Sequence, residues 1–164
     1  MSFTISAAAR AQLPEIRDIY NEVIRNSTAV FSDVEVTLEN REAWFDAKRT
    51  AGFPLLAATD SSGVVGFGTF GEFRTWPGYR YSVEHSVHVR ADCRGRGVGR
   101  ALVQALLQEA ARMHMHVMIA GIDAQNVTSV SLHEKLGFKT VGTLPEIACK
   151  FGRWLDLKFM QRLI

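Results

Sequence analysis

The segment RGRGVGRA, residues 94–101, combines three arginines and three glycines directly before an apolar helical pattern. Glycines let a ligand approach the backbone closely, and the first turn of a helix leaves N–H groups without partners. With arginine side chains added, such a loop suits a phosphate or pyrophosphate; a glycine-rich turn with solvated arginines is the alternative. No Gly-Lys-Ser/Thr follows, so it is not a P-loop, and Leu102 replaces the last glycine of the dinucleotide-binding fingerprint.

A second candidate lies just upstream, where Glu84 interrupts the apolar run YSVEHSVHV, residues 81–89. Strand alternation places Glu84, Ser86 and His88 on one face and His85 on the other face, among valines. A carboxylate in such a strand is expected to be either ion-paired or functional, because burying an unpaired charge is costly. The sequence therefore offers a candidate functional carboxylate shortly before the basic loop.

The composition limits the ligand of this loop to a small anion. The chain has 164 residues and a formal net charge of +2, so we expect a single domain, 1–164, and no binding to nucleic acid. Its two cysteines form no disulfide or metal-binding framework, which favours the cytoplasm. We find no signal peptide and no apolar run long enough to span a membrane. His114 and His116 lack partners at suitable spacing, so no metal site is expected.

Helical and strand patterns alternate along the chain and must position these groups. Apolar residues recur with helical spacing in four segments, and Thr37 is the expected N-cap of the second one. The expected helices cover residues 13–26, 37–52, 97–113 and 126–138. Apolar runs with strand patterns cover residues 2–8, 54–73 (a hairpin through DSSG), 81–89, 116–122, 139–144 and 153–161. Helices inserted among mostly adjacent strands predict a mixed α/β sheet.

Two motifs about 30 residues apart resemble one family. Arg94-x-x-Gly97-x-Gly99, after a strand and at the start of a helix, resembles the acyl-CoA loop of the GCN5-related N-acetyltransferases (GNAT). The segment NVTSVSLHEKLGF, residues 126–138, is similar to a later helix of that family. Over nearly its whole length the chain looks closest to the phosphinothricin and methionine sulfoximine N-acetyltransferases. The resemblance implies a GNAT fold, a twisted, mostly antiparallel mixed sheet flanked by helices and splayed between its fourth and fifth strands.

The resemblance also implies acetyl-CoA as the co-substrate. Backbone N–H groups of the basic loop would hold the pyrophosphate, and the preceding strand would offer backbone groups to the amides of pantetheine. The later helix would add one asparagine and one lysine, although the lysine has the alternative of being simply solvated. The implied cofactor-binding residues are Val87, His88, Val89, Arg94, Gly95, Arg96, Gly97, Val98, Gly99, Arg100, Asn126 and Lys135.

Transfer of an acetyl group to an amine requires a neutral nitrogen, and an α-amino group with a pKa of about 8 is mostly protonated near neutral pH. The resemblance therefore implies that Glu84 is the general base. His133 stands where the wider family places a tyrosine, and it would protonate the departing thiolate of coenzyme A. The alternatives are an edge-strand ion pair for Glu84 and a packed helix histidine for His133. Direct transfer in a ternary complex is expected, because Cys93 lies in the phosphate loop rather than beside the acetyl group.

The implied acceptor is a small amino-acid analogue of the phosphinothricin, methionine sulfoximine or methionine sulfone type, acetylated on its α-amino group. The implied substrate-binding residues are Arg74, Thr75, Trp76, Glu84, His85 and Ser86. Phe31 stands where close relatives often have Trp, and residues 150–156 could border the pocket from a second subunit of a homodimer. Trp76 and Trp154 could instead be ordinary packing residues. The remaining alternatives are a polyamine acceptor, a protein N-terminus, and a non-catalytic acyl-CoA sensor.

Overall fold

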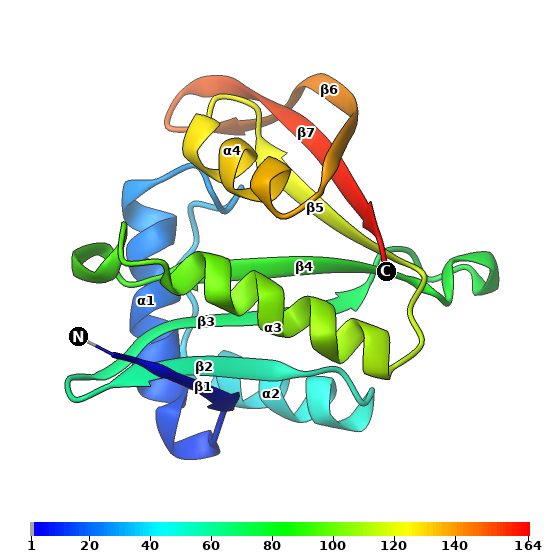
Figure 1. The fold of residues 1–164 in the computed structure, drawn as a ribbon. Coiled ribbons are helices and arrows are strands. Elements are labelled where there is room, and N and C mark those ends of the chain that lie inside the picture. The colour runs from blue at the N-terminus through cyan, green and yellow to red at the C-terminus, as the bar shows by residue number, and fades with distance from the viewer. Residues whose placement is uncertain (1) are drawn as a thin grey trace.

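The computed structural model describes residues 2–164 and contains one seven-stranded sheet with the order β1-β2-β3-β4-β5-β7-β6 (Figure 1). Only the β4–β5 pair is parallel, so the expected mixed, mostly antiparallel sheet is confirmed. The strands are β1 (Thr4–Ala7), β2 (Leu55–Asp60), β3 (Gly63–Glu72), β4 (Ser82–Val89), β5 (Val117–Asp123), β6 (Lys139–Lys150) and β7 (Arg153–Leu163).

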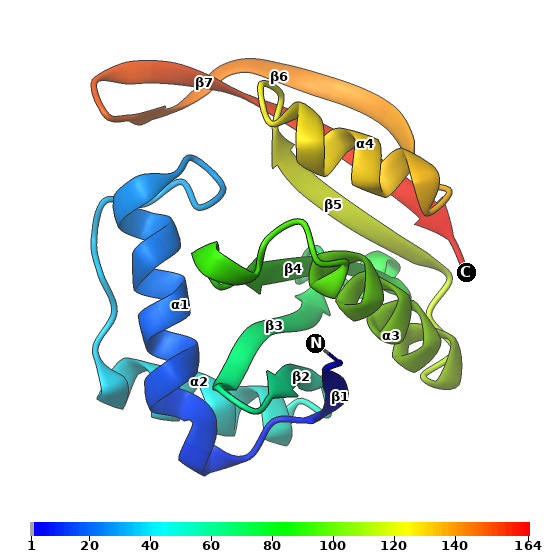
Figure 2. The same ribbon diagram turned by 60° about the vertical axis from the view of Figure 1, so that its left-hand side comes forward.

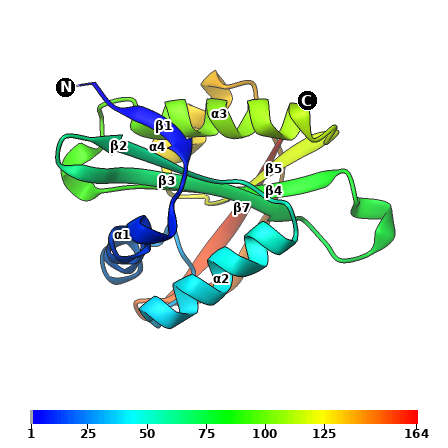
Figure 3. The same ribbon diagram turned by 90° about the horizontal axis from the view of Figure 1, so that it is seen from below.

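Helices cover both faces of this sheet. They are α1 (Leu13–Asn26), α2 (Leu38–Thr50), α3 (Val98–Arg112) and α4 (Val127–Lys135). Figure 3 shows α1 and α2 below the sheet and α3 above it. The larger apolar cluster packs α3 against β2 to β5, and a smaller cluster packs α1 and α2 against β2 and β3. The sheet thus separates two layers, and β4 presents one face to each.

Local sequence signals account for the helix boundaries. Pro14 lies in the first turn of α1, where its missing N–H costs no hydrogen bond. The side chain of Thr37 accepts a hydrogen bond from the N–H of Asn40, as its position before α2 predicts. Gly97, with φ +84°, precedes α3 in a left-handed conformation that a residue with a side chain adopts only at a cost. The four expected helices are therefore confirmed, within three residues at their ends.

The sheet opens between β4 and β5. These strands pair only at Ser82–Val117, Val83–Met118 and Glu84–Ile119, whereas β4 continues to Val89 and β5 to Asp123. Figure 2 shows the two strands diverging beyond the paired segment. The splay expected between the fourth and fifth strands is confirmed. Glu84 is the last residue of β4 that pairs with β5 before the two strands separate.

The C-terminal hairpin differs in length from the sequence expectation. A strand was expected to end at Leu144, but β6 continues to Lys150. Pro145 lies within this longer strand, although proline has no N–H for a ladder. Since β6 is the edge strand, it accommodates the proline at a register shift between Leu144 and Ala148, where Glu146 adopts φ +49°. In the described chain, residues 2–164, no helix is both long and apolar enough to cross a membrane.

Candidate active site

The basic loop forms a concave turn of free N–H groups between β4 and α3. Gly95 and Gly97 have φ values of +76° and +84°, and no side chain caps the N-terminus of α3. Within residues 2–164, the backbone N–H groups of positions 95–100 donate no hydrogen bond. This backbone is complementary to a pyrophosphate, because several N–H groups and the helix dipole favour an anion at the same place.

Two of the three loop arginines already hold carboxylates. Arg94 pairs with Glu22 at 2.6 Å and also donates to the carbonyl of Val89 at 3.2 Å. Arg96 pairs with Asp60 at 3.1 Å. These pairs hold the loop against α1 and the β2–β3 turn, so both arginines must share or exchange partners to grip a phosphate. In the chain from residue 2 onward, Arg100 makes no such ion pair, so its guanidinium could bind a phosphate without giving up a carboxylate partner.

The splay exposes backbone groups along one edge of β4. A narrow cavity of about 90 Å³ follows this edge between β4, β5 and α4. It is lined by residues 85–88 and 120–123 together with Ala29, Asn126, Ser129 and His133. The side chain of His88 itself is buried between the rings of Tyr20 and Phe67 on the other face, and burial lowers its pKa to about 4. The imidazole of His88 therefore points away from the splay.

Glu84 lies where the splay meets a second cavity, of about 340 Å³, on the face covered by α1 and α2. Burial raises the pKa of its carboxyl group, and the positive charge of Arg74 opposes that rise. Within residues 2–164 no cation lies within 4.0 Å of this carboxylate, so the ion-pair alternative is not realised. A Cβ atom on Gly121 of β5 would lie only 2.8 Å from its Oε1. The absence of a side chain at Gly121 thus leaves room for this carboxylate, and no sequence pattern singled out this glycine.

His133 is buried on α4, and both of its ring nitrogens have partners. Its Nδ1 lies 2.7 Å from the carbonyl oxygen of Ser129, so Nδ1 carries the hydrogen. Its Nε2 lies 3.1 Å from Nε2 of His85, and burial lowers the pKa of both rings, to about 3 for His85. Neutral His133 must then accept a hydrogen bond from His85. The Nδ1 of His85 is left buried without a partner within residues 2–164.

The expected substrate-binding residues separate into two groups. Arg74, Thr75 and Trp76 are exposed on the segment after β3, where the Arg74 guanidinium lies 4.6 Å from the centre of the Phe73 ring. Trp76 is 74% exposed and Trp154 is 63% exposed, so neither is an ordinary packing residue in this chain. The strand residues Glu84, His85 and Ser86 all border the 340 Å³ cavity, but the side chain of His85 packs on the opposite face against His133 and Phe138.

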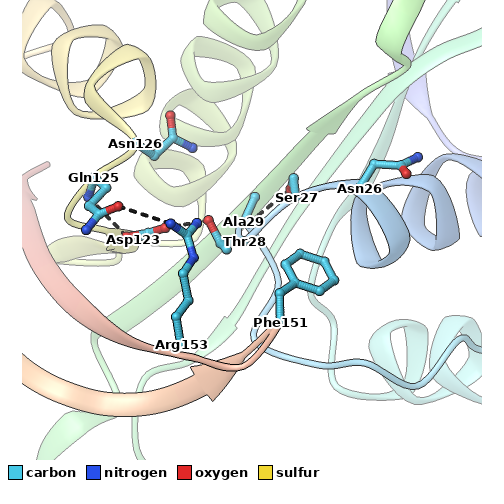
Figure 4. Close-up of a pocket in the computed structure, with 9 residues that line it drawn as sticks. All are labelled: Asn26, Ser27, Thr28, Ala29, Asp123, Gln125, Asn126, Phe151 and Arg153. Carbon is cyan, nitrogen blue, oxygen red and sulfur yellow. Dashed lines mark hydrogen bonds between the residues drawn. The ribbon is translucent and has the colours of Figure 1, made fainter.

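The loop between α1 and α2 contacts residues of β5 and β6 through hydrogen bonds. Lys150 is 1% exposed, and its Nζ donates to the carbonyls of Ser27 and Val30 at 2.6 and 2.7 Å. The hydroxyl of Thr28 donates to Asp123 at the end of β5. A third cavity, of about 430 Å³, lies beside these contacts, where Figure 4 shows Arg153 of β7 directed toward Gln125. Lys135 lies outside this region, exposed on α4.

Known proteins with the same sequence pattern and fold carry acetyltransferase names. An L-methionine sulfoximine/L-methionine sulfone acetyltransferase of Pseudomonas paraeruginosa is 48% identical over 98% of this chain and 94% of its own length. A crystal structure of a ribosomal-protein-alanine N-acetyltransferase from Brucella melitensis shares 43% identity with a TM-score of 0.97, covering 98% of this chain and 99% of that one.

A third similar protein is a phosphinothricin acetyltransferase from Sinorhizobium meliloti, solved in complex with acetyl-CoA. It is 33% identical with a TM-score of 0.96, over 100% of this chain and 89% of that one. Residues 15–138 match the profile of the acetyltransferase (GNAT) family, and this range contains the basic loop, Glu84 and the splay. The chain therefore belongs to the acetyltransferase (GNAT) family.

Proposed function

We propose that this protein transfers an acetyl group from acetyl-CoA to the α-amino group of a methionine sulfoximine-like amino acid. The observation that carries the proposal is the position of Glu84, at the last paired residue before the splay and on the wall of the 340 Å³ cavity. A base at that place lies between a channel for a thioester and a cavity for an amine. The name of the Pseudomonas relative supports the acceptor class.

Acetyl-CoA fits the residues present. The free N–H groups of positions 95–100 would hold its pyrophosphate, and Arg100 would add charge. The backbone of residues 87–89 along the open edge of β4, with Asn126 at the start of α4, would hold the pantetheine. When bound, acetyl-CoA supplies an acetyl thioester whose acyl group passes to the acceptor nitrogen while the sulfur leaves as the thiol.

Glu84 removes the proton that the acceptor nitrogen must lose. Its raised pKa makes it a stronger base than an exposed glutamate, and it is active in the ionised form, at pH values above that pKa. Cys93 is buried beneath the basic loop and does not line the cavity that holds Glu84. This arrangement favours direct transfer in a ternary complex over a route through a cysteine.

His133 is proposed to serve the departing sulfur. Because Nδ1–H is fixed on Ser129, only Nε2 is available to carry an additional proton, and it faces His85. Donation from Nε2 therefore requires the contact between the two histidines to open. Arg74 is proposed to bind the α-carboxylate of the acceptor, since its charge already influences Glu84.

We further propose a cytoplasmic homodimer. The two cysteines of the chain, Cys93 and Cys149, form no disulfide with each other, which fits a reducing compartment. The edge strand β6 and its neighbour β7 expose Val141, Leu144, Ile147 and Trp154, which would be covered by a second copy. Light scattering on the purified protein tests this part, and a monomer at micromolar concentration would overturn it.

The function is tested by measuring thiol release from acetyl-CoA with a panel of acceptors. Methionine sulfoximine, methionine sulfone and phosphinothricin should be acetylated far better than ordinary amino acids, spermidine or a peptide with a free N-terminal alanine. Preference for the peptide or for spermidine would replace the acceptor class. Binding of acetyl-CoA without thiol release from any acceptor would indicate a sensor and refute the catalytic proposal.

A further inference from the structure

The 340 Å³ cavity beside Glu84 contains a buried arginine that has no carboxylate partner. Arg41 of α2 is 9% exposed, and its guanidinium lies 4.8 Å from the centre of the Tyr20 ring and 4.6 Å from that of Trp44. Among the described residues, 2–164, its guanidinium donates hydrogen bonds only to the side chain of Asn40, its neighbour in sequence. Within residues 2–164, no carboxylate oxygen lies within 4.0 Å of it.

The rest of the cavity does not neutralise this charge by direct contact. Lys48, about two turns further along α2, donates to the carbonyl of Phe70, and burial lowers the pKa of its amine. Glu72 and Glu84 also line the cavity, but in the chain from residue 2 onward neither forms an ion pair with Arg41 or Lys48. Two N–H groups of the Arg41 guanidinium share the single neutral amide oxygen of Asn40. A buried guanidinium normally has a further oxygen partner for its remaining N–H groups, because its desolvation is otherwise uncompensated. A ligand that brings oxygen atoms into the cavity would supply that partner.

We propose that Arg41 recognises the far end of the acceptor, a side-chain group that carries two oxygens such as a sulfone or a phosphinate. The fork of a guanidinium donates two parallel hydrogen bonds to such a pair of oxygens. The rings of Tyr20 and Trp44 hold the guanidinium in place. Together with the ring of Phe67, which packs against both, they give the methylene groups of the acceptor an apolar wall. This subsite rests on the proposed function: the amine is placed at Glu84, and the side chain extends from there toward α2.

The subsite is tested by varying the end group of the acceptor while its α-amino acid part stays constant. Wild-type protein and the variant Arg41→Gln are assayed with methionine sulfone, phosphinothricin and norleucine, whose side chain has no polar end. The variant should lose roughly 10- to 100-fold in kcat/KM with the first two acceptors, mainly through KM, and less than threefold with norleucine. Arg49→Gln is the matched control, because Arg49 also lies on α2 over an aromatic ring but is exposed.

The outcomes separate the two proposals. If the wild-type protein releases no thiol with any acceptor, the proposed function itself fails. If it is active but Arg41→Gln weakens all three acceptors equally, Arg41 is structural and the subsite is refuted. Calorimetric titration with acetyl-CoA and thermal unfolding report whether the variant is folded. Should Arg41→Gln not fold, Arg41→Lys keeps the charge without the fork, and the same selective loss with the sulfone is expected; unchanged selectivity would overturn the proposal.

Discussion

Gly121 gives the sharpest test of how the candidate base is positioned. A Cβ atom added at this position of β5 would lie 2.8 Å from Oε1 of Glu84 and 3.3 Å from Cδ1 of Leu157. Ordinary van der Waals contact begins at about 3.4 Å, so Gly121→Ala forces the carboxylate to move by about 0.6 Å. Because the clash is with the end of a flexible side chain, the fold should tolerate the methyl group.

The displacement should be visible in catalysis. A misplacement of about 1 Å at a catalytic group can cost about 100-fold in rate, so a shift of this size should lower kcat by roughly 10-fold. The assay is thiol release at saturating acetyl-CoA and methionine sulfoximine. Gly142→Ala on β6 is the control, since a Cβ atom there meets nothing within 4 Å and should leave kcat unchanged.

The two variants, Gly121→Ala and Gly142→Ala, should bind acetyl-CoA with affinities that agree within about threefold. Their midpoints of thermal unfolding should agree within a few degrees. If Gly121→Ala retains the wild-type kcat while Glu84→Gln does not, the carboxylate tolerates displacement. In that case Gly121 does not position the base.

Four further predictions, made with three variants, concern the base, the acceptor and the loop. Glu84→Gln should lower kcat by about 10²–10⁴-fold with little change in acetyl-CoA affinity, and retention of half of the wild-type kcat would remove Glu84 from the base role. Arg74→Ala removes the charge that lowers the pKa of Glu84, so the acidic limb of the kcat–pH profile should move to higher pH; a limb that moves to lower pH would contradict this. The same variant should lose about 10-fold in kcat/KM with methionine sulfoximine but little with its decarboxylated analogue, and equal losses would make Arg74 structural. Gly99→Val should weaken acetyl-CoA binding, measured by calorimetry, at least 10-fold (about 1.4 kcal/mol). The fold should tolerate this change, because a Cβ atom at position 99 makes only ordinary contacts with Val89 and Leu132. Unchanged affinity would contradict the pyrophosphate assignment.

The sequence alone determined the features that depend on neighbouring residues. The cap at Thr37, the proline in the first turn of α1 and the left-handed Gly97 before α3 each require only a few adjacent positions. Alternation along β4 likewise separated Glu84 from His85, and their side chains do lie on opposite faces of the sheet. The family motifs added the mostly antiparallel arrangement of the sheet and its opening between the fourth and fifth strands, which no local pattern contains.

Only the tertiary structure decided which distant groups meet. The partners of Arg94 and Arg96 come from α1 and the end of β2, far away in sequence. The closeness of Gly121 to Glu84 follows from the register of two strands joined through α3. No sequence pattern distinguishes Arg41 from the other polar residues of its helix. Only the packing of α1 against α2 places its guanidinium between the rings of Tyr20 and Trp44. Contacts of this kind depend on strand order, register and helix packing, and these are set by burial across the whole sheet rather than by the spacing of residues along one element.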